Sequence, residues 1–600
     1  MTQLTPNSWT AMLPRGDQWD ALFGFAPIAI VGWLAFVLIA GVMLKSIARL
    51  PPSVVEWCSG RFTGPRQFGA LALGLLALIL IVDGSSFWNG FFRQDDFSFL
   101  AVAREGHSIS QQMIMYHNDH LYLLFRLQVS ALLSVAGPTA DEACLAGWFN
   151  LVSLFAHASV LWAGAWLLQE AGAKRAAIMS AALITWAWPG WAEFTTGYYA
   201  IGVYVQVLAL GLAGSSATLR YLRTGHRRWQ LGAIGLATIA VGLNISGLWA
   251  FVAQALAVIC FRWPAWRDRR GLSHLVSALS LFIVSTLVLM VGLRHDRSAR
   301  EYVQNPTGST VDSQFAHMGR QPIAVTGLTL LSAPGGSLLS LATPPYLQFG
   351  ARKIADRPVL QSAMTGLQLI PVVALLVWFL RRKAHPPRAE VRFPMFAFMV
   401  VLVLAAMVIL ARPDYAAASP VFLWLPKYQV SLWVWAVLGL AFLIERILVS
   451  RPKPEVAILK GLSLTIMLSV AFTLFHASFE KAVEPGPVSY ISQGRLAHLA
   501  AAKIRRADYR EVMAILKNHQ HAQKSDAIQL PPWANWKNAF TLKYPLLEWS
   551  GDTGVSGVTY LFADLPFARP ESNLRVEWAP SPKFDRSSGP SERLASFFNP

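Results

Sequence analysis

Apolar runs about as long as a bilayer is thick constrain this chain more than any other feature of its sequence. A helix needs about 20 apolar residues to cross the hydrocarbon core of a membrane, and runs of that length recur along most of the chain. Hydrophobic residues make up 54% of the sequence and charged residues 14%, which is typical of a membrane protein. The expected spans lie near residues 23–44, 67–86, 145–169, 175–191, 198–217, 272–293, 359–380, 392–411, 429–449 and 457–477.

One further apolar segment, residues 231–261, is too long for a single upright helix. It is interrupted by Asn244, Ser246 and Gly247, so we expect a tight pair of short helices there. With this pair included, the sequence predicts an all-α polytopic membrane protein of about 12 transmembrane helices.

The basic residues give the chain a formal net charge of +18. They fall between the apolar runs rather than on one soluble face, so we expect contacts with membrane lipids and no nucleic-acid partner. Lys and Arg in short loops mark the cytoplasmic side, and one assignment satisfies every short loop, provided that residues 231–261 form a hairpin. The cytoplasmic groups are then those around Lys45–Arg66, Lys174–Arg175, Arg220–Arg228, Arg262–Arg270, Arg381–Arg388 and Arg446–Lys453.

The same assignment divides the chain into three parts. Residues 1–66 hold an extra N-terminal transmembrane helix and a cytoplasmic loop. Residues 67–477 form the main transmembrane domain, with large external loops at 87–142 and 294–358. Residues 478–600 have mixed charge, many prolines and no spanning run, which predicts a soluble extracytoplasmic domain.

That C-terminal part is expected to be a small α+β domain. Apolar residues recur at helical spacing over residues 495–518, and residues 555–562 and 574–578 resemble short strands. The three cysteines, Cys58, Cys144 and Cys260, are far apart and predict no disulfide framework.

Two adjacent carboxylates, Asp95 and Asp96, open the first external loop. Negative charge nearby and partial desolvation raise a carboxyl pKa toward values useful to a general base. The alternative is a solvated loop start in which one aspartate pairs with Arg93.

The same loop continues to the sequence Tyr-His-Asn-Asp-His, followed by an apolar helix that carries Arg126. Such a helix is expected to lie along the membrane interface. His117, Asp119 and His120 offer imidazole and carboxylate ligands that suit a divalent metal, but their spacing matches no recognised site. No cofactor is expected. The alternative to metal binding is that these side chains are simply hydrated.

Further polar residues are expected on the same side of the membrane. Glu193 follows two tryptophans, Trp188 and Trp191, in the short loop 189–197, where it either assists the aspartates or belongs to an aromatic belt at the interface. Arg412, Lys427 and Tyr428 bracket the loop 412–428. Cations on the external side run against the positive-inside bias, so we expect them to bind an anion such as phosphate there. The alternative is that the Lys427 side chain only reaches the lipid headgroups.

The order of these features resembles the C-type glycosyltransferases, which include the protein O-mannosyltransferases and the bacterial aminoarabinose transferases. The resemblance covers about residues 88–476 and rests on short motifs. It implies that Asp95 or Asp96 acts as general base and that Glu193 matches a second acidic position. Lys427 and Tyr428 match a late basic-aromatic pair near the donor phosphate, with Lys in place of the more usual Arg.

The resemblance implies an enzyme of the bacterial inner membrane whose active site faces the periplasm. It would transfer a sugar from a polyprenyl-phosphate donor to a lipid, glycan or protein acceptor, by one inverting displacement. Two other classes explain the helix count and the basic loops equally well. One is a multi-pass transporter or lipid flippase, and the other is a non-catalytic membrane assembly subunit.

Overall fold

The computed structural model describes residues 52–62, 65–84, 120–137, most of 142–262, 268–295, 323–340, 388–411 and 426–449, with shorter pieces between and beyond them. This part is mostly helical, and six of its helices are long and apolar enough to cross a membrane: α9, α12, α14, α15, α21 and α23. The helices with defined bounds are α3 (Pro52–Ser59), α4 (Pro65–Asp83), α8 (Leu123–Ala136), α9 (Glu142–Glu170), α10 (Arg175–Ala187), α11 (Trp191–Thr195), α12 (Tyr199–Thr224), α13 (Arg227–Leu243), α14 (Leu248–Arg262), α15 (Arg269–His295), α18 (Ile323–Leu339), α21 (Arg388–Ala411) and α23 (Pro426–Val449).

Most of the expected spans coincide with these helices. The expected span at 23–44 lies outside the described residues, and those at 359–380 and 457–477 are described only in part. Helices α4, α8, α10 and α18 also contain apolar stretches, of 10–17 residues, whereas the span that includes α14 begins at the preceding 3-10 turn and covers Ile245–Arg262. The chain is therefore a helical membrane protein.

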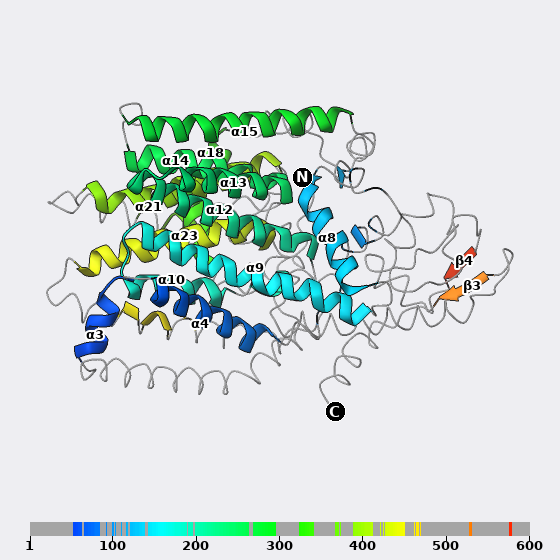
Figure 1. Cartoon of the computed structure of the whole chain (residues 1–600), viewed down its shortest axis with the longest axis horizontal. Coiled ribbons are helices and arrows are strands. Elements are labelled where there is room, and N and C mark those ends of the chain that lie inside the picture. Colours follow the sequence, from blue (N-terminus) through cyan, green and yellow to red (C-terminus); the bar gives the residue numbers. More distant parts are fainter. Residues whose placement is uncertain are drawn as a thin grey trace, which may run out of the picture.

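Helix α12 lies at the centre of the bundle and packs against α9, α13 and α14. The long helices run side by side (Figure 1), and glycines allow them to approach closely. A Cβ at Gly211 would lie 2.2 Å from the ring of Trp249, and one at Gly214 would lie 2.9 Å from the Gln254 amide nitrogen. That amide donates to the carbonyl of Ala233 at 2.7 Å, so α12, α13 and α14 form one unit.

The predicted helix pair at 231–261 is confirmed. Helix α13 ends at Leu243, a 3-10 turn covers Ile245–Gly247, and α14 begins at Leu248. The Asn244 side chain accepts a hydrogen bond from the Ser246 amide at 2.8 Å. A Cβ at Gly247 would lie 2.4 Å from the backbone of Ala240, so glycine is required for the tight turn.

The basic loops meet at one end of the bundle, the end at which α3 lies on the left of Figure 1. The Arg446 guanidinium donates to the carbonyl of Gly172 at 3.0 Å, and Arg392 donates to the carbonyl of Phe261 at 3.2 Å. Arg175 donates to the carbonyl of Trp57 at 2.8 Å. Loops far apart in sequence therefore share one end, as the positive-inside assignment requires. We call it the basic end.

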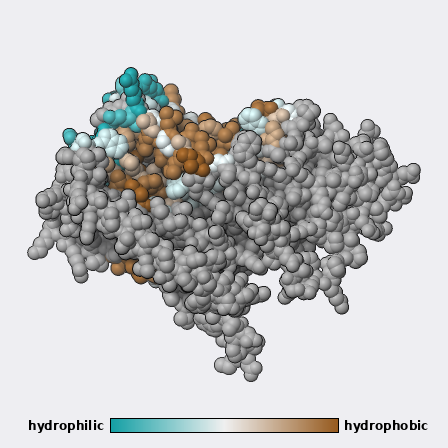
Figure 2. Space-filling model, turned by 90° about the horizontal axis from the view of Figure 1, so that it is seen from below, coloured by the Kyte–Doolittle hydropathy of each residue, from teal (hydrophilic) through white to brown (hydrophobic). Residues whose placement is uncertain are grey.

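Helix α15 presents much of its apolar surface outward. Val276, Ile283, Leu287 and Val291 are among its exposed side chains, and only 6% of its most apolar stretch is buried. Figure 2 views the molecule from the side away from α15 and shows a further hydrophobic area there, with hydrophilic residues toward one end. Exposed apolar area of this extent suits lipid rather than water.

Part of the segment 294–358, expected to be a long external loop, is helical. Residues 323–339 of this loop form the apolar helix α18, which packs against α21 and α23. Its length is short of a full span, and Pro334 lies inside it, so its sequence gives a weak transmembrane signal. Its packing partners supply the stability that its own length does not.

Helix α8 runs steeply across the long helices, at the end opposite the basic end (Figure 1), the orientation expected of an interfacial helix. Its Arg126 is buried, with the guanidinium carbon 5.0 Å from the Phe99 ring centroid. Further out lies a parallel strand pair, β3 (Ala527–Leu530) with β4 (Arg575–Trp578). Strand β4 falls within the strand expected at 574–578, whereas residues 495–518 and 555–562 lie outside the described residues.

Candidate functional site

Asp96 is buried and caps the first turn of α12. Its Oδ1 accepts a hydrogen bond from the Ala200 amide at 2.6 Å, and 3% of the residue is exposed. A carboxylate at a helix N-terminus is stabilised by unpaired amides and by the helix dipole. The bond fastens the segment at Asp96 to α12, whereas Asp95 lies outside the described residues.

A layer of polar and aromatic contacts supports this junction. The Tyr199 hydroxyl donates to Asn150 Oδ1 at 2.5 Å and lies 3.1 Å from the Ala146 carbonyl. The Phe92 ring packs edge-on against Tyr199, with centroids 5.3 Å apart. A Cβ at Gly90 would lie 2.4 Å from the Asn150 amide. The loop that carries the aspartates is therefore held against both α9 and α12.

Glu193 lies in α11, a short helix where the sequence predicted a loop. The residue is 4% exposed. Its neighbours Trp188 and Trp191 are fully buried, so they do not form an aromatic belt at the interface. The Trp191 ring stacks on His157 of α9 with centroids 4.0 Å apart, and its indole nitrogen donates to the Thr185 carbonyl at 2.6 Å. This packing fixes the position of Glu193.

Lys427 and Tyr428 lie in the first turn of α23 and are half-buried. The Lys427 ammonium lies 5.1 Å from the centroid of the Tyr428 ring. A cation in the first turn of a helix is disfavoured by the helix dipole, while both the dipole and the cation attract anions. The pair therefore suits an anionic ligand.

Helix α11 brings these groups together, since it contacts α9, α12 and α23. Trp188, just before α11, stacks on Trp433 of α23 with ring centroids 6.4 Å apart. The acidic residues Asp96 and Glu193 and the cation Lys427 therefore lie at the same end of the bundle, opposite the basic end. The arrangement offers carboxylates for proton transfer and a cation for a phosphate.

The structure does not show four of the other predicted site residues joined to this group. Asp119 and Arg412 lie outside the described residues. His117 and His120 are opposite each other in a small antiparallel hairpin, β1 (Tyr116–His117) with β2 (His120–Leu121). Within the described part of the chain, no three His, Cys, Asp or Glu side chains are placed to hold a metal ion.

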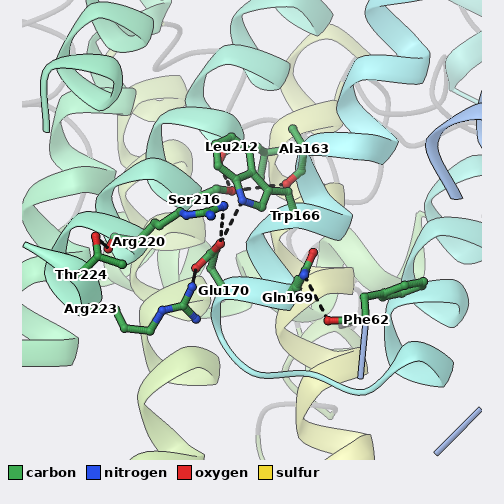
Figure 3. Close-up of polar contacts among 10 residues, drawn as sticks. All are labelled: Phe62, Ala163, Trp166, Gln169, Glu170, Leu212, Ser216, Arg220, Arg223 and Thr224. Atoms are coloured by element: carbon green, nitrogen blue, oxygen red, sulfur yellow. Dashed lines mark hydrogen bonds and ion pairs between the residues drawn. The ribbon is translucent and has the colours of Figure 1, made fainter. Parts of the chain in front are cut away.

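A second charged cluster, at the basic end, was not predicted from the sequence. Figure 3 shows Glu170, at the end of α9, pointing toward two arginines of α12. Its carboxylate lies 3.5 Å from Arg220 and 2.5 Å from Arg223, and accepts from the Trp166 indole at 3.1 Å. The two arginines are three residues apart and share one helix face, which was the available signal. We assign the cluster to holding α9 against α12.

Comparison of the chain with protein-family models, curated proteins and solved structures gives no match.

Proposed function

We propose that the protein is a membrane glycosyltransferase that uses a polyprenyl-phosphate sugar donor and an extracytoplasmic acceptor. The observation that carries the proposal is the position of Asp96, Glu193 and Lys427 at the same end of a membrane bundle, opposite the basic end. Acidic groups beside a cation suit transfer from a phosphate leaving group. In this proposal the chain has about 12 spans in the bacterial inner membrane, and residues 478–600 form a periplasmic α+β domain.

The mechanism assigns one task to each group. Asp95, next to the anchored Asp96, removes the proton of the acceptor hydroxyl as its oxygen attacks the anomeric carbon. Lys427, with Arg412, stabilises the charge on the departing polyprenyl phosphate. Glu193 contacts the sugar or orients the acceptor, and His117, Asp119 and His120 line the acceptor side. The displacement inverts the anomeric centre.

Mass spectrometry of the lipid bound to Lys427 variants tests the donor class. We expect a polyprenyl phosphate to copurify with the unaltered protein and with Lys427→Arg, because both side chains are cations. Lys427→Met should lower its occupancy about tenfold, the effect of one charge-assisted hydrogen bond. A full complement of donor lipid in Lys427→Met would contradict the phosphate role.

The outward position of the site is tested by thiol labelling. Cys144 is exposed and is replaced by Ser, whereas Cys58 and Cys260 are buried. Burial raises the pKa of the Cys58 thiol, so its reactive thiolate is scarce at neutral pH. On this background, a membrane-impermeant maleimide should label Ser110→Cys in intact cells. It should label His226→Cys, between α12 and α13, only after permeabilisation. The reverse pattern would reject an outer-face enzyme.

A transporter is the second candidate, favoured by the buried imidazole of His157 within the spanning helix α9. Ionisable groups inside a membrane often serve proton or solute pathways. Packing is the other explanation for the buried imidazole, because its ring stacks on Trp191. Solute uptake by proteoliposomes without any acceptor would favour transport, and copurification of a stable protein partner would favour an assembly subunit.

A further inference from the structure

A partly open cavity runs along α23, from Trp433 to Leu448 toward the basic end. Its volume is about 200 Å³, and it lies between α10 and α23, with Gly461, Leu462, Thr465 and Leu338 completing its wall. Most of the lining is aliphatic, and Ser180, Thr465 and Glu445 are among its few polar residues.

Glu445 is the charged residue of this lining, and it is 3% exposed. Its Oε2 accepts a hydrogen bond from the Lys174 amide at 2.7 Å. Its Oε1 has no hydrogen-bond partner among the described residues, and the nearest cation is Arg446 at 3.8 Å. A buried carboxylate oxygen without a donor is costly, so this oxygen calls for a donor from a ligand.

Cations surround the same carboxylate. Arg446, Lys174 and Arg61 all act on Glu445 electrostatically. Arg61 and Arg446 both reach Gly172, where an added Cβ would lie 3.6 Å and 3.9 Å from their respective guanidinium nitrogens. The positive φ of 89° at Gly172 favours glycine at this position. At the Glu445 end, the cavity is thus lined by a carboxylate oxygen without a hydrogen bond, and positive charge lies just behind that carboxylate, outside the lining itself.

We propose that this cavity binds a glycerophospholipid whose headgroup carries a primary amine. The ammonium donates to Glu445 Oε1, and the phosphate lies against Arg446 and Arg61. Only a headgroup with both signs of charge satisfies both features, and basic sites between helices are known to favour phospholipid headgroups.

The apolar part of the cavity suits one acyl chain of the same lipid. Its lining on α23 runs from Trp433 to Leu448, which is about 22 Å of helix at 1.5 Å per residue. One leaflet of the hydrocarbon core is about 15 Å thick, so the cavity is long enough for a tail entering from that leaflet. The site does not depend on the proposed transferase activity.

Native mass spectrometry of delipidated protein tests the proposal. The probes are phosphatidylethanolamine, phosphatidylcholine and phosphatidylglycerol with identical acyl chains. Phosphatidylcholine keeps both charges but lacks N–H donors, and phosphatidylglycerol lacks the ammonium. We expect phosphatidylethanolamine to bind at concentrations about tenfold lower than the other two, the effect of one charge-assisted hydrogen bond.

Two variants locate the site. Glu445→Gln should remove the preference for phosphatidylethanolamine, and Ala441→Phe, which fills the cavity, should weaken all three lipids. Glu170→Gln is the matched control, since it neutralises another carboxylate at the basic end whose side chain is 4% exposed, and it should keep the ranking. Equal binding of phosphatidylethanolamine and phosphatidylcholine by the unaltered protein would overturn the proposal, whether or not the variants fold. Displacement of bound phosphatidylethanolamine by polyprenyl phosphate would also overturn it.

Discussion

Replacing Asp95 with Asn should lower sugar transfer from a labelled polyprenyl-phosphate donor by about 10²- to 10⁴-fold, the usual contribution of a general base. The side chains are nearly isosteric, but the amide accepts no proton at neutral pH. The protein should remain folded, because the anchoring bond of this loop belongs to Asp96 and the Ala200 amide. The check is the initial rate of transfer in membranes, normalised to the amount of folded protein.

Asp96 supplies the matched control at the neighbouring position. The Asn amide oxygen can still accept the bond from Ala200, so Asp96→Asn should keep the loop in place and retain more activity than Asp95→Asn. Asp96→Ala loses the cap and should cost about 0.5–2 kcal/mol of stability. Loss of transfer in Asp96→Asn without a change in melting temperature would make Asp96 the base instead. Full activity in both Asn variants would reject the enzymatic proposal.

Removing both arginines that face Glu170 should be the most destabilising change at the basic end. The double variant Arg220→Met and Arg223→Met leaves a carboxylate that is 4% exposed without its cations, at a cost of about 3–5 kcal/mol. Glu170→Gln should cost less, because the arginine side chains are 39% and 58% exposed and stay hydrated. Thermal unfolding in detergent measures the difference.

Arg227→Met is the control for this comparison, because it removes an exposed arginine at the start of α13, just after the end of α12. Its effect should stay within about 0.5 kcal/mol. If the double arginine variant and Glu170→Gln lost equal stability, that result would contradict the view that the cost comes mainly from leaving a buried carboxylate without its cations.

The helices were predictable wherever the local sequence decides the structure. Asn244 and Gly247 break an apolar run, and the structure has a turn at the same place. Helix α18 was missed because its stability comes from α21 and α23 rather than from its own length. Burial also changes the interpretation of the tryptophans around Glu193, since Trp188 and Trp191 are core residues.

The candidate site was predictable as a set of residue types but not as a set of contacts. The sequence indicates that Asp96, Glu193 and Lys427 belong to the same side of the membrane. It does not indicate that Asp96 caps α12, because that bond joins residues 104 positions apart. Nor does the sequence indicate that Glu445 is buried beside a cavity. A single acidic residue near the end of an apolar helix is common, and only its neighbours in the fold distinguish this one.

The helix break at Asn244 affects more of the chain than the turn in which it lies. In the proposed topology, α13 and α14 double back, so this stretch makes an even number of passes rather than an odd one. A continuous helix over the same residues would invert every later segment, including the lysine at the start of α23 and the whole C-terminal part. In that topology, the side of the membrane on which each later segment lies therefore depends on one amide side chain and on the glycine three residues after it.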